Sequence, residues 1–177
     1  MSGPSSGKNP RLTLVLGGAR SGKSVMAERL VTAEPGPWTY IATAGQCDDR
    51  EMDQRIADHQ KRRGPGWVTL EAPIDLAHAL IETARHPVLV DCLTLWLSNL
   101  MLGGHDVPAA TQAATAALVT RITPCILVAN EVGLGIVPDN ALARAFRDEA
   151  GRLNSHMASV CDRVLFVAAG LPLTLKG

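Results

Sequence analysis

Neither charge is in excess in this sequence, because its 177 residues contain 17 lysines and arginines and 17 aspartates and glutamates. A formal net charge of zero creates no overall field that would attract nucleic acid or an anionic membrane surface. We therefore expect no nucleic-acid partner, and any cluster of one sign must serve a local purpose. The chain length suits one domain with a substantial buried core.

Closely spaced cysteines are also missing. The four cysteines are far apart and form no CxxC pair: Cys47, Cys92, Cys125 and Cys161. Three of them lie in or beside apolar stretches, where cysteine behaves as a small packed hydrophobe. A disulfide framework or a zinc site is therefore not expected, and the pattern suits a reducing cytoplasm.

No run of residues is apolar for long enough to predict a membrane span. The most apolar stretch, residues 86–104, is interrupted by Asp91, Ser98 and Asn99. A span needs about 20 predominantly apolar residues. Residues 1–10 lack the apolar segment of a signal peptide, and we interpret them as a flexible tail.

Short apolar runs alternate with segments of helical spacing along the rest of the chain. Strands are predicted at residues 11–18, 38–44, 67–72, 87–92, 125–133 (with its loop) and 163–170. Helices are predicted at residues 23–33, 47–63, 73–86, 93–102, 107–121 and 138–160. Continuously apolar strands that alternate with helices are typical of an α/β fold, a mainly parallel sheet with helices on both faces. No boundary follows residue 11, so residues 11–177 are expected to form a single domain.

The segment GGARSGKS fits the phosphate-loop (P-loop) pattern G-x-x-x-x-G-K-[ST]. It comprises Gly17, Gly18, Ala19, Arg20, Ser21, Gly22, Lys23 and Ser24. It follows a predicted strand and opens a predicted helix, which is the context that the motif requires. Backbone N–H groups and the helix N-terminus would hold phosphate oxygens, with Lys23 reaching the β and γ phosphates and the Ser24 hydroxyl binding Mg²⁺. The alternative is a glycine-rich turn that only joins strand to helix.

Acidic residues end several of the predicted strands. Asp91 ends the apolar run VLVD, and the carboxyl ends of strands line the ligand crevice in an open α/β sheet. Asp91 can hold Mg²⁺ there, directly or through water, or it can cap the next helix. Glu71, Asn130 and Glu131 reach the same crevice if their strands are parallel, as ligands or as loop residues.

One histidine lies among arginines. On a helix, Arg55, His59, Arg62 and Arg63 would share one face. Neighbouring cations disfavour the imidazolium form, so they would keep the ring of His59 neutral and nucleophilic. The same cations can neutralise a triphosphate, and a neutral imidazole beside phosphates can attack phosphorus. A charged surface histidine is the alternative.

The P-loop predicts nucleotide binding but leaves two classes of protein open. One is an enzyme that transfers a phosphoryl or nucleotidyl group to a small molecule. The other is a nucleotide-dependent switch or binding module, for which the sequence lacks the guanine-reading motif N-K-x-D and a long basic surface. The histidine cluster favours the enzyme.

Taken together, the motifs resemble those of the bifunctional adenosylcobinamide kinase / adenosylcobinamide-phosphate guanylyltransferase family of cobalamin biosynthesis. The resemblance covers residues 12–176 and rests on GGARSGKS, YIATA, RIADHQKRRGPGW, NEVGLGIVPDNALARAFRDEAGRLN and VAAGLPLTLK. It implies a RecA-like P-loop NTPase domain that assembles into a cytoplasmic homotrimer. A P-loop kinase with a single activity is the alternative within the enzyme class.

The resemblance also implies a reaction and a set of site residues. The enzyme would phosphorylate adenosylcobinamide, a corrinoid, with ATP or GTP. It would then transfer GMP from GTP to that phosphate through a guanylyl-histidine at His59, giving adenosylcobinamide-GDP. The implied GTP contacts are Gly17 to Ser24, Ala42, Thr43, Ala44, Gln60, Lys61, Arg62, Arg63, Glu71 and Asp91.

Overall fold

The structure, a computed structural model, describes residues 10–44 and 64–177 of the chain. The strands in these ranges are β1 (Leu12–Gly17), β2 (Trp38–Ala42), β3 (Trp67–Glu71), β4 (Val88–Asp91), β5 (Cys125–Asn130), β6 (Arg163–Ala168) and β7 (Leu171–Lys176). The helices there are α1 (Lys23–Thr32), α3 (Leu76–Glu82), α4 (Leu93–Leu102), α5 (Val107–Thr120) and α6 (Ala141–Val160). None of these helices combines the length and the apolar character needed to cross a bilayer.

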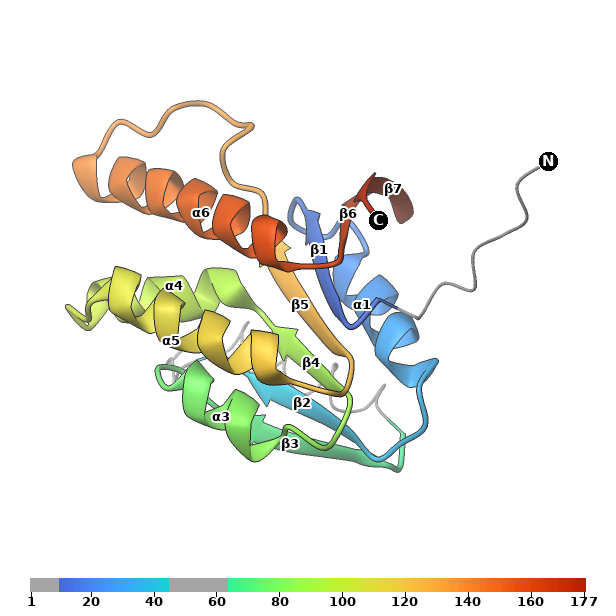
Figure 1. Cartoon of the computed structure of the whole chain (residues 1–177). Helices are drawn as coiled ribbons and strands as arrows, with labels where there is room; N and C mark the ends of the chain where they lie inside the picture. The colour runs from blue at the N-terminus through green and yellow to red at the C-terminus, as the bar shows by residue number, and fades with distance from the viewer. Residues whose placement is uncertain (1–9, 45–63) are drawn as a thin grey trace.

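The strands form one sheet in the order β3-β2-β4-β5-β1-β6-β7. All neighbouring pairs are parallel except β6 and β7, which are antiparallel. Gly17 at the end of β1 is level with Asn130 of β5, and Ala42 of β2 is level with both Glu71 and Asp91. The carboxyl ends of the parallel strands therefore meet at one edge of the sheet (Figure 1).

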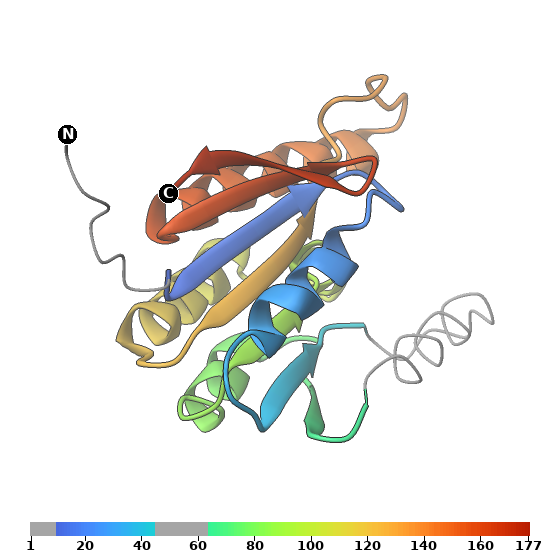
Figure 2. The same cartoon turned by 90° about the vertical axis from the view of Figure 1, so that its right-hand side faces the viewer.

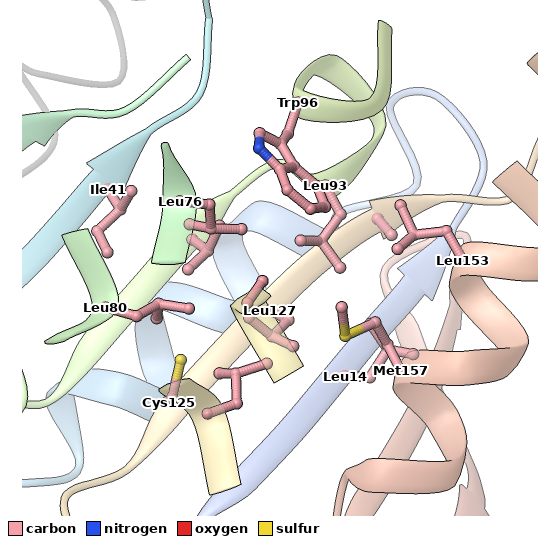
Figure 3. Close-up of a cluster of buried hydrophobic side chains, with 14 of the residues drawn as sticks. Leu14, Ile41, Leu76, Leu80, Leu93, Trp96, Cys125, Leu127, Leu153 and Met157 are labelled. Carbon is pink, nitrogen blue, oxygen red and sulfur yellow. The ribbon is translucent and has the colours of Figure 1, made fainter. Parts of the chain in front are cut away.

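Helices cover both faces of the sheet, with α1 on one face and α3, α4, α5 and α6 on the other (Figures 1 and 2). Alternate residues of β1 are buried on opposite faces, because Val15 packs with Ala27 and Val31 of α1 whereas Leu14 belongs to the opposite cluster with Met157 (Figure 3). Burial on both faces explains the continuously apolar strands. The predicted α/β fold is confirmed.

Two helices begin later than their prolines suggested. The N-cap of α3 is Asp75, whose carboxylate accepts a hydrogen bond from the His78 N–H (3.0 Å), and the N-cap of α6 is Asn140. Pro73 and Pro138 therefore precede these helices. A side-chain oxygen at the N-cap accepts a hydrogen bond from an N–H group of the first turn. Proline has no N–H group and provides no such acceptor.

The antiparallel strand β7 was not predicted. It follows β6 through a two-residue turn, Ala169 and Gly170, which both have positive φ (52° and 78°). Such backbone angles in both turn residues suit a tight hairpin. Pro172 disfavours a strand in the sequence, but it is tolerated because β7 is the edge of the sheet.

A buried arginine at the C-terminal end of α5 joins that helix to the C-terminal end of α3. Arg121 is only 1% exposed and donates hydrogen bonds to the carbonyl oxygens of Leu80 (2.6 Å), Thr83 (3.0 Å) and His86 (2.7 Å). Burial lowers its pKa from the ordinary value. A guanidinium is well suited to satisfy several carbonyls at the end of a helix at once.

Replacing this arginine is expected to destabilise the fold without changing the chemistry. Arg121→Met would remove the buried hydrogen bonds that the guanidinium donates to three carbonyls and should cost about 3 kcal/mol or more in the free energy of unfolding. Urea unfolding measures this loss, and Arg85→Met, at an exposed neighbour, is the matched control. Equal urea midpoints for Arg121→Met and Arg85→Met would contradict the stabilising role of Arg121.

Candidate nucleotide-binding site

The P-loop joins β1 to α1 in a conformation that only certain residues allow. Gly22, the N-cap of α1, has φ 96° and ψ 3°, in the left-handed region. A Cβ atom at Gly22 would lie 3.1 Å from the Cα atom of Gly170. No side chain caps the first turn of α1, and no acidic residue lies in it. Its N–H groups and the positive end of the helix can therefore receive an anion.

The β6–β7 hairpin packs against the P-loop and stabilises it. The Gly170 N–H donates a hydrogen bond to the Ser21 carbonyl (2.8 Å), and a Cβ atom at Gly17 would lie 2.5 Å from the Val167 carbonyl oxygen. This close packing requires glycine at the start of the loop. The sequence analysis missed this support together with β7, although glycine between two apolar runs is a known signal of a hairpin.

Lys23 lies at the centre of the site. Its side chain is mostly buried (8% exposed), and its Nζ atom donates a hydrogen bond to the Gly18 carbonyl (2.8 Å). Burial lowers the pKa of Lys23, while negative charge at Cys92 and at Asp91 acts in the opposite sense. Burial also raises the pKa of the Cys92 thiol to about 11. The thiol is therefore neutral at neutral pH, and Asp91 is the anion that stabilises the Lys23 ammonium there.

Asp91 is half-buried at the carboxyl end of β4. The N-cap residue of the next helix, α4, is Cys92, whose own side chain makes no capping hydrogen bond. Asp91 therefore lies at the edge of the sheet where a ligand role and a capping role were both predicted. Its carboxylate and the Ser24 hydroxyl are hard oxygen donors of the kind that Mg²⁺ prefers.

The described ranges contain no group of three or more histidine, cysteine or acidic side chains suited to a metal ion. Mg²⁺ in phosphoryl-transfer sites is commonly held by only one or two protein oxygens, with phosphate and water completing its shell. Ser24 and Asp91 fit this pattern and would hold the ion between the P-loop and β4. Bound there, the ion would neutralise charge on the transferred phosphate.

The residue that follows β2 is hydrogen-bonded to the residue that follows β4. Thr43 is fully buried, and its hydroxyl both accepts a hydrogen bond from the Cys92 N–H and donates one to the Cys92 carbonyl, each at 2.7 Å. These bonds occupy the Thr43 side chain, so a nucleotide would meet this segment mainly through Ala42, Ala44 and backbone groups. Glu71, at the end of the neighbouring strand, is exposed at the same edge.

Polar side chains of helix α4 form hydrogen bonds with residues at or after the carboxyl ends of β2, β3 and β5. The sequence analysis did not predict a role for these side chains. Thr94 accepts a hydrogen bond from the Asn130 N–H (2.7 Å), and Trp96 donates one to the Ile74 carbonyl (2.7 Å). Asn99 donates to the carbonyls of Thr43 (2.8 Å) and Pro73 (3.0 Å). The only signal in the sequence was Asn99 as an interruption of an apolar run.

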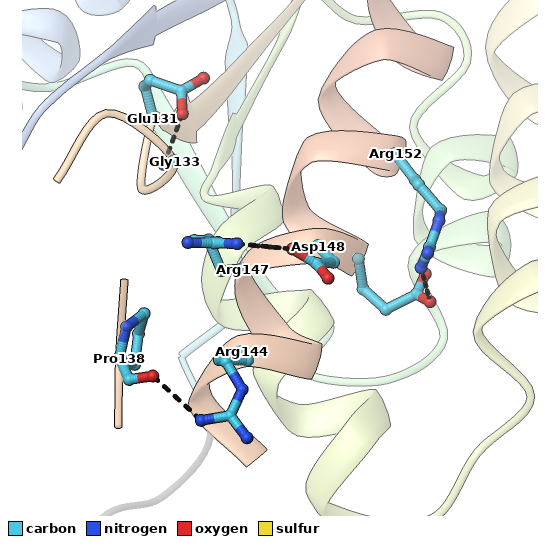
Figure 4. A network of polar contacts seen from close by, with 8 residues as sticks. Glu131, Gly133, Pro138, Arg144, Arg147, Asp148 and Arg152 are labelled. Atoms are coloured by element: carbon cyan, nitrogen blue, oxygen red, sulfur yellow. Dashed lines mark hydrogen bonds and ion pairs between the residues drawn. The ribbon is translucent and has the colours of Figure 1, made fainter. Parts of the chain in front are cut away.

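The loop after β5 is shaped by its own polar contacts. The Glu131 carboxylate accepts a hydrogen bond from the Gly133 N–H (2.6 Å), and Arg144 donates one to the Pro138 carbonyl (3.1 Å) (Figure 4). One carboxylate oxygen of Glu131 is thus used within the loop. Large apolar side chains in this loop are exposed: Leu134, Ile136 and Val137.

The histidine cluster lies outside the described residues. This applies to every predicted site residue of that segment: Arg55, His59, Gln60, Lys61, Arg62 and Arg63. Their roles remain predictions. Near the P-loop, the raised pKa of Cys92 argues against a thiolate nucleophile at neutral pH.

A P-loop between the first strand and first helix of a mainly parallel sheet, with an acidic residue ending a nearby strand, defines the P-loop NTPase class. Its layers have the RecA-like arrangement. Within this class, the sequence matches the family described as cobinamide kinase / cobinamide phosphate guanyltransferase over residues 13–175, and the chain belongs to that family. The predicted family resemblance is confirmed, and the protein is a transferase of cobalamin biosynthesis.

Similar curated proteins are named for adenosylcobalamin biosynthesis. The bifunctional adenosylcobalamin biosynthesis protein CobP of Pseudomonas aeruginosa is 49% identical over 170 residues, which cover 93% of this chain and 96% of that protein. The protein CobU of Escherichia coli is 39% identical over 183 residues, covering 93% and 99%. The CobU protein of Salmonella typhimurium is 40% identical with the same coverage.

One solved structure supports the fold alone. The flagellar accessory protein FlaH from Methanocaldococcus jannaschii matches with a TM-score of 0.53 and 13% sequence identity, covering 94% of this chain and 78% of that one.

Proposed function

We propose that the protein phosphorylates adenosylcobinamide with ATP or GTP and then converts the product to adenosylcobinamide-GDP with GTP. The observation that carries this proposal is Lys23, held over the P-loop beside Asp91 in a chain that matches the kinase / guanyltransferase family. Both reactions act on nucleotide phosphates, and the described residues contain one P-loop, so we assign both to this site.

The phosphoryl transfer needs no protein nucleophile. The substrate hydroxyl attacks the γ phosphorus, the bond to the β-phosphate oxygen breaks, and ADP or GDP leaves. The N–H groups of the P-loop orient the phosphates, and Lys23 neutralises charge on the β and γ oxygens. Ser24 and Asp91 would hold Mg²⁺.

The guanylyl transfer uses two displacements at the α phosphorus of GTP. In the first, a ring nitrogen of His59 attacks and pyrophosphate leaves, which gives a phosphoramidate. In the second, a phosphate oxygen of adenosylcobinamide phosphate attacks, and the nitrogen–phosphorus bond breaks to restore the imidazole. The assigned nucleotide contacts beyond the P-loop are Ala42, Thr43, Ala44, Gln60, Lys61, Arg62, Arg63 and Glu71.

We further assign a homotrimeric assembly, from the family resemblance, and a cytoplasmic location, from the cysteine pattern. Exposed apolar side chains such as Leu134 and Ile136 are compatible with contacts between copies. Light scattering on the purified protein measures the assembly.

The decisive experiment is product analysis. The protein is incubated with adenosylcobinamide, ATP and GTP, and the phosphate is resolved from the GDP adduct. Both products are expected. The phosphate alone would indicate a kinase with a single activity, and neither product would favour a nucleotide-dependent binding module.

Asp91 is expected to set the Mg²⁺ requirement. Asp91→Asn keeps the shape of the side chain and removes the charge, so the Mg²⁺ concentration for half-maximal activity should rise about tenfold, in line with the loss of one charged contact. Titration of both activities with Mg²⁺ measures this shift. Asp106→Asn, at the N-cap of the remote helix α5, is the control, because asparagine caps as well as aspartate. Identical titrations for both variants would remove Asp91 from the metal site.

A further inference from the structure

The backbone of Asn130, the last residue of β5, is held on both sides. Its N–H donates to the Thr94 hydroxyl of α4 (2.7 Å), and its carbonyl accepts a hydrogen bond from the Asn154 amide of α6 (3.1 Å). The next N–H group, that of Glu131, donates to the Gly17 carbonyl at the start of the P-loop (3.0 Å). Because Thr94 and Asn154 are buried, these hydrogen bonds fix the end of β5 firmly against the P-loop.

The side chain of Asn130 lies on the face of the sheet that α1 covers. Ile126 and Val128 of the same strand belong to the apolar cluster that contains Ala27 of α1, which we call the α1 cluster. Side chains two residues apart in a strand share one face. The P-loop enters α1 on this same face, so the amide of Asn130 and the P-loop lie on one side of the sheet.

Neither neighbouring strand places a side chain over the Asn130 amide. The residue level with it in β1 is Gly17, and β4 ends at Asp91, which is level with Val128, two residues earlier. Asn130 is half-buried, and within residues 10–44 and 64–177 its amide makes no hydrogen bond. Its two N–H donors are therefore available to a ligand between the P-loop and β4.

The ligand of the Asn130 amide follows from the groups around the proposed phosphate site. Asp91 shares the face of Asn130, because Leu89, two residues before it in β4, belongs to the α1 cluster. The two backbones are separated by one strand spacing of about 5 Å and by about 7 Å along the strands. Lys23 and the proposed Mg²⁺ ion would hold the β and γ phosphates between these strands. The terminal phosphate would then lie within reach of the Asn130 amide.

We infer that Asn130 donates a hydrogen bond to the terminal phosphate of the bound nucleotide and gives the site its preference for a triphosphate over a diphosphate. This inference rests on the proposed nucleotide site. An amide suits this role because it offers N–H donors without a negative charge that would repel the phosphate. The diphosphate left by phosphoryl transfer lacks the group that Asn130 binds, so it is held less tightly and can leave.

Equilibrium binding of two nucleotides to the whole protein tests this role. Titration calorimetry in the presence of Mg²⁺ compares ADP with an ATP analogue whose β and γ phosphates are joined by a methylene group. Asn130→Ala should weaken binding of the analogue about 10-fold or more, as expected for one hydrogen bond to a charged group, and binding of ADP less than about twofold. Asn130→Asp should weaken the analogue further, because its carboxylate would repel the phosphate.

Asn140→Asp is the matched control, because it makes the same change at the N-cap of α6, where the side chain accepts a hydrogen bond from the Ala143 N–H (2.7 Å). Aspartate caps a helix as well as asparagine does, so both affinities should stay unchanged. If Asn130→Ala does not fold, Asn130→Asp, which has the same shape as asparagine, provides the same comparison.

Equal weakening of both nucleotides by the Asn130 variants, or no weakening of either, would overturn the role in binding the terminal phosphate. An unaltered protein that binds neither nucleotide would contradict the proposed nucleotide site, and this inference with it. The titrations contain no corrinoid, so an unaltered protein that forms neither corrinoid product would leave the binding result intact.

Discussion

Lys23→Met should remove both activities while leaving the fold at least as stable as before. The ammonium is the main side-chain cation of the P-loop, and its Nζ atom is held at the Gly18 carbonyl by a hydrogen bond of 2.8 Å. Loss of one such preorganised group commonly costs about 100- to 1,000-fold in rate. Kinase and labelling assays at saturating Mg²⁺ measure the loss.

The stability of this variant follows from the direction of the Lys23 pKa. Burial lowers it below the ordinary value of 10.5, so the folded state carries the charge at a cost. This cost is fully present below the folded pKa and is relieved as the pH rises toward the unfolded value. Methionine removes it at every pH. The thermal midpoint of Lys23→Met should therefore match or exceed that of the unaltered protein at neutral pH, with a smaller difference in alkali.

Lys176→Met supplies the opposite result as a control. Lys176 donates hydrogen bonds to the carbonyls of Ala158 (3.0 Å), Ser159 (3.1 Å) and Cys161 (2.6 Å) at the end of α6. Its replacement should lower the thermal midpoint and leave both activities of the folded protein intact. Near-normal rates in Lys23→Met would show that this lysine does not act on the phosphates.

The sequence predicted those features of the site that depend on neighbours along the chain. The P-loop requires only a strand, a glycine-rich turn and a helix in succession, so Gly17 to Ser24 were recognisable from their pattern. The shared edge of Glu71, Asp91 and Asn130 followed from the expectation of parallel strands, and the parallel pairing of β3, β2, β4 and β5 confirms it.

The missed features depend on distant parts of the chain. Asn99 and the Thr43 carbonyl are 56 residues apart, so no local pattern links them. Gly170 supports Ser21 from a hairpin whose second strand contains a proline, which sequence patterns penalise. The sequence also left two roles open for Asp91, because a helix cap and a metal ligand have the same sequence pattern. The structure adds that the N-cap residue of α4 is Cys92, which directly follows Asp91.

His59→Ala should abolish guanylyl transfer and leave phosphoryl transfer in place. The proposed guanylyl transfer needs a covalent carrier, whereas phosphoryl transfer needs only positioning and charge neutralisation. GTP labelled at the α phosphate should label the unaltered protein, and GTP labelled at the γ phosphate should not. A phosphoramidate resists alkali and breaks in acid, the reverse of an acyl phosphate, so the label should survive base and be lost in acid.

His78→Ala is the control for this result, because His78 has a highly exposed side chain (74%) on α3, and its loss should change neither labelling nor transfer. Adenosylcobinamide phosphate should accumulate with His59→Ala, since phosphoryl transfer continues and guanylyl transfer stops. Because both reactions are assigned to the P-loop, a folded His59→Ala protein that lost its kinase activity as well would indicate a nucleotide-binding role for this residue. Full labelling of His59→Ala would exclude it as the nucleophile, and the labelled residue could then be located by peptide mapping among the remaining histidines.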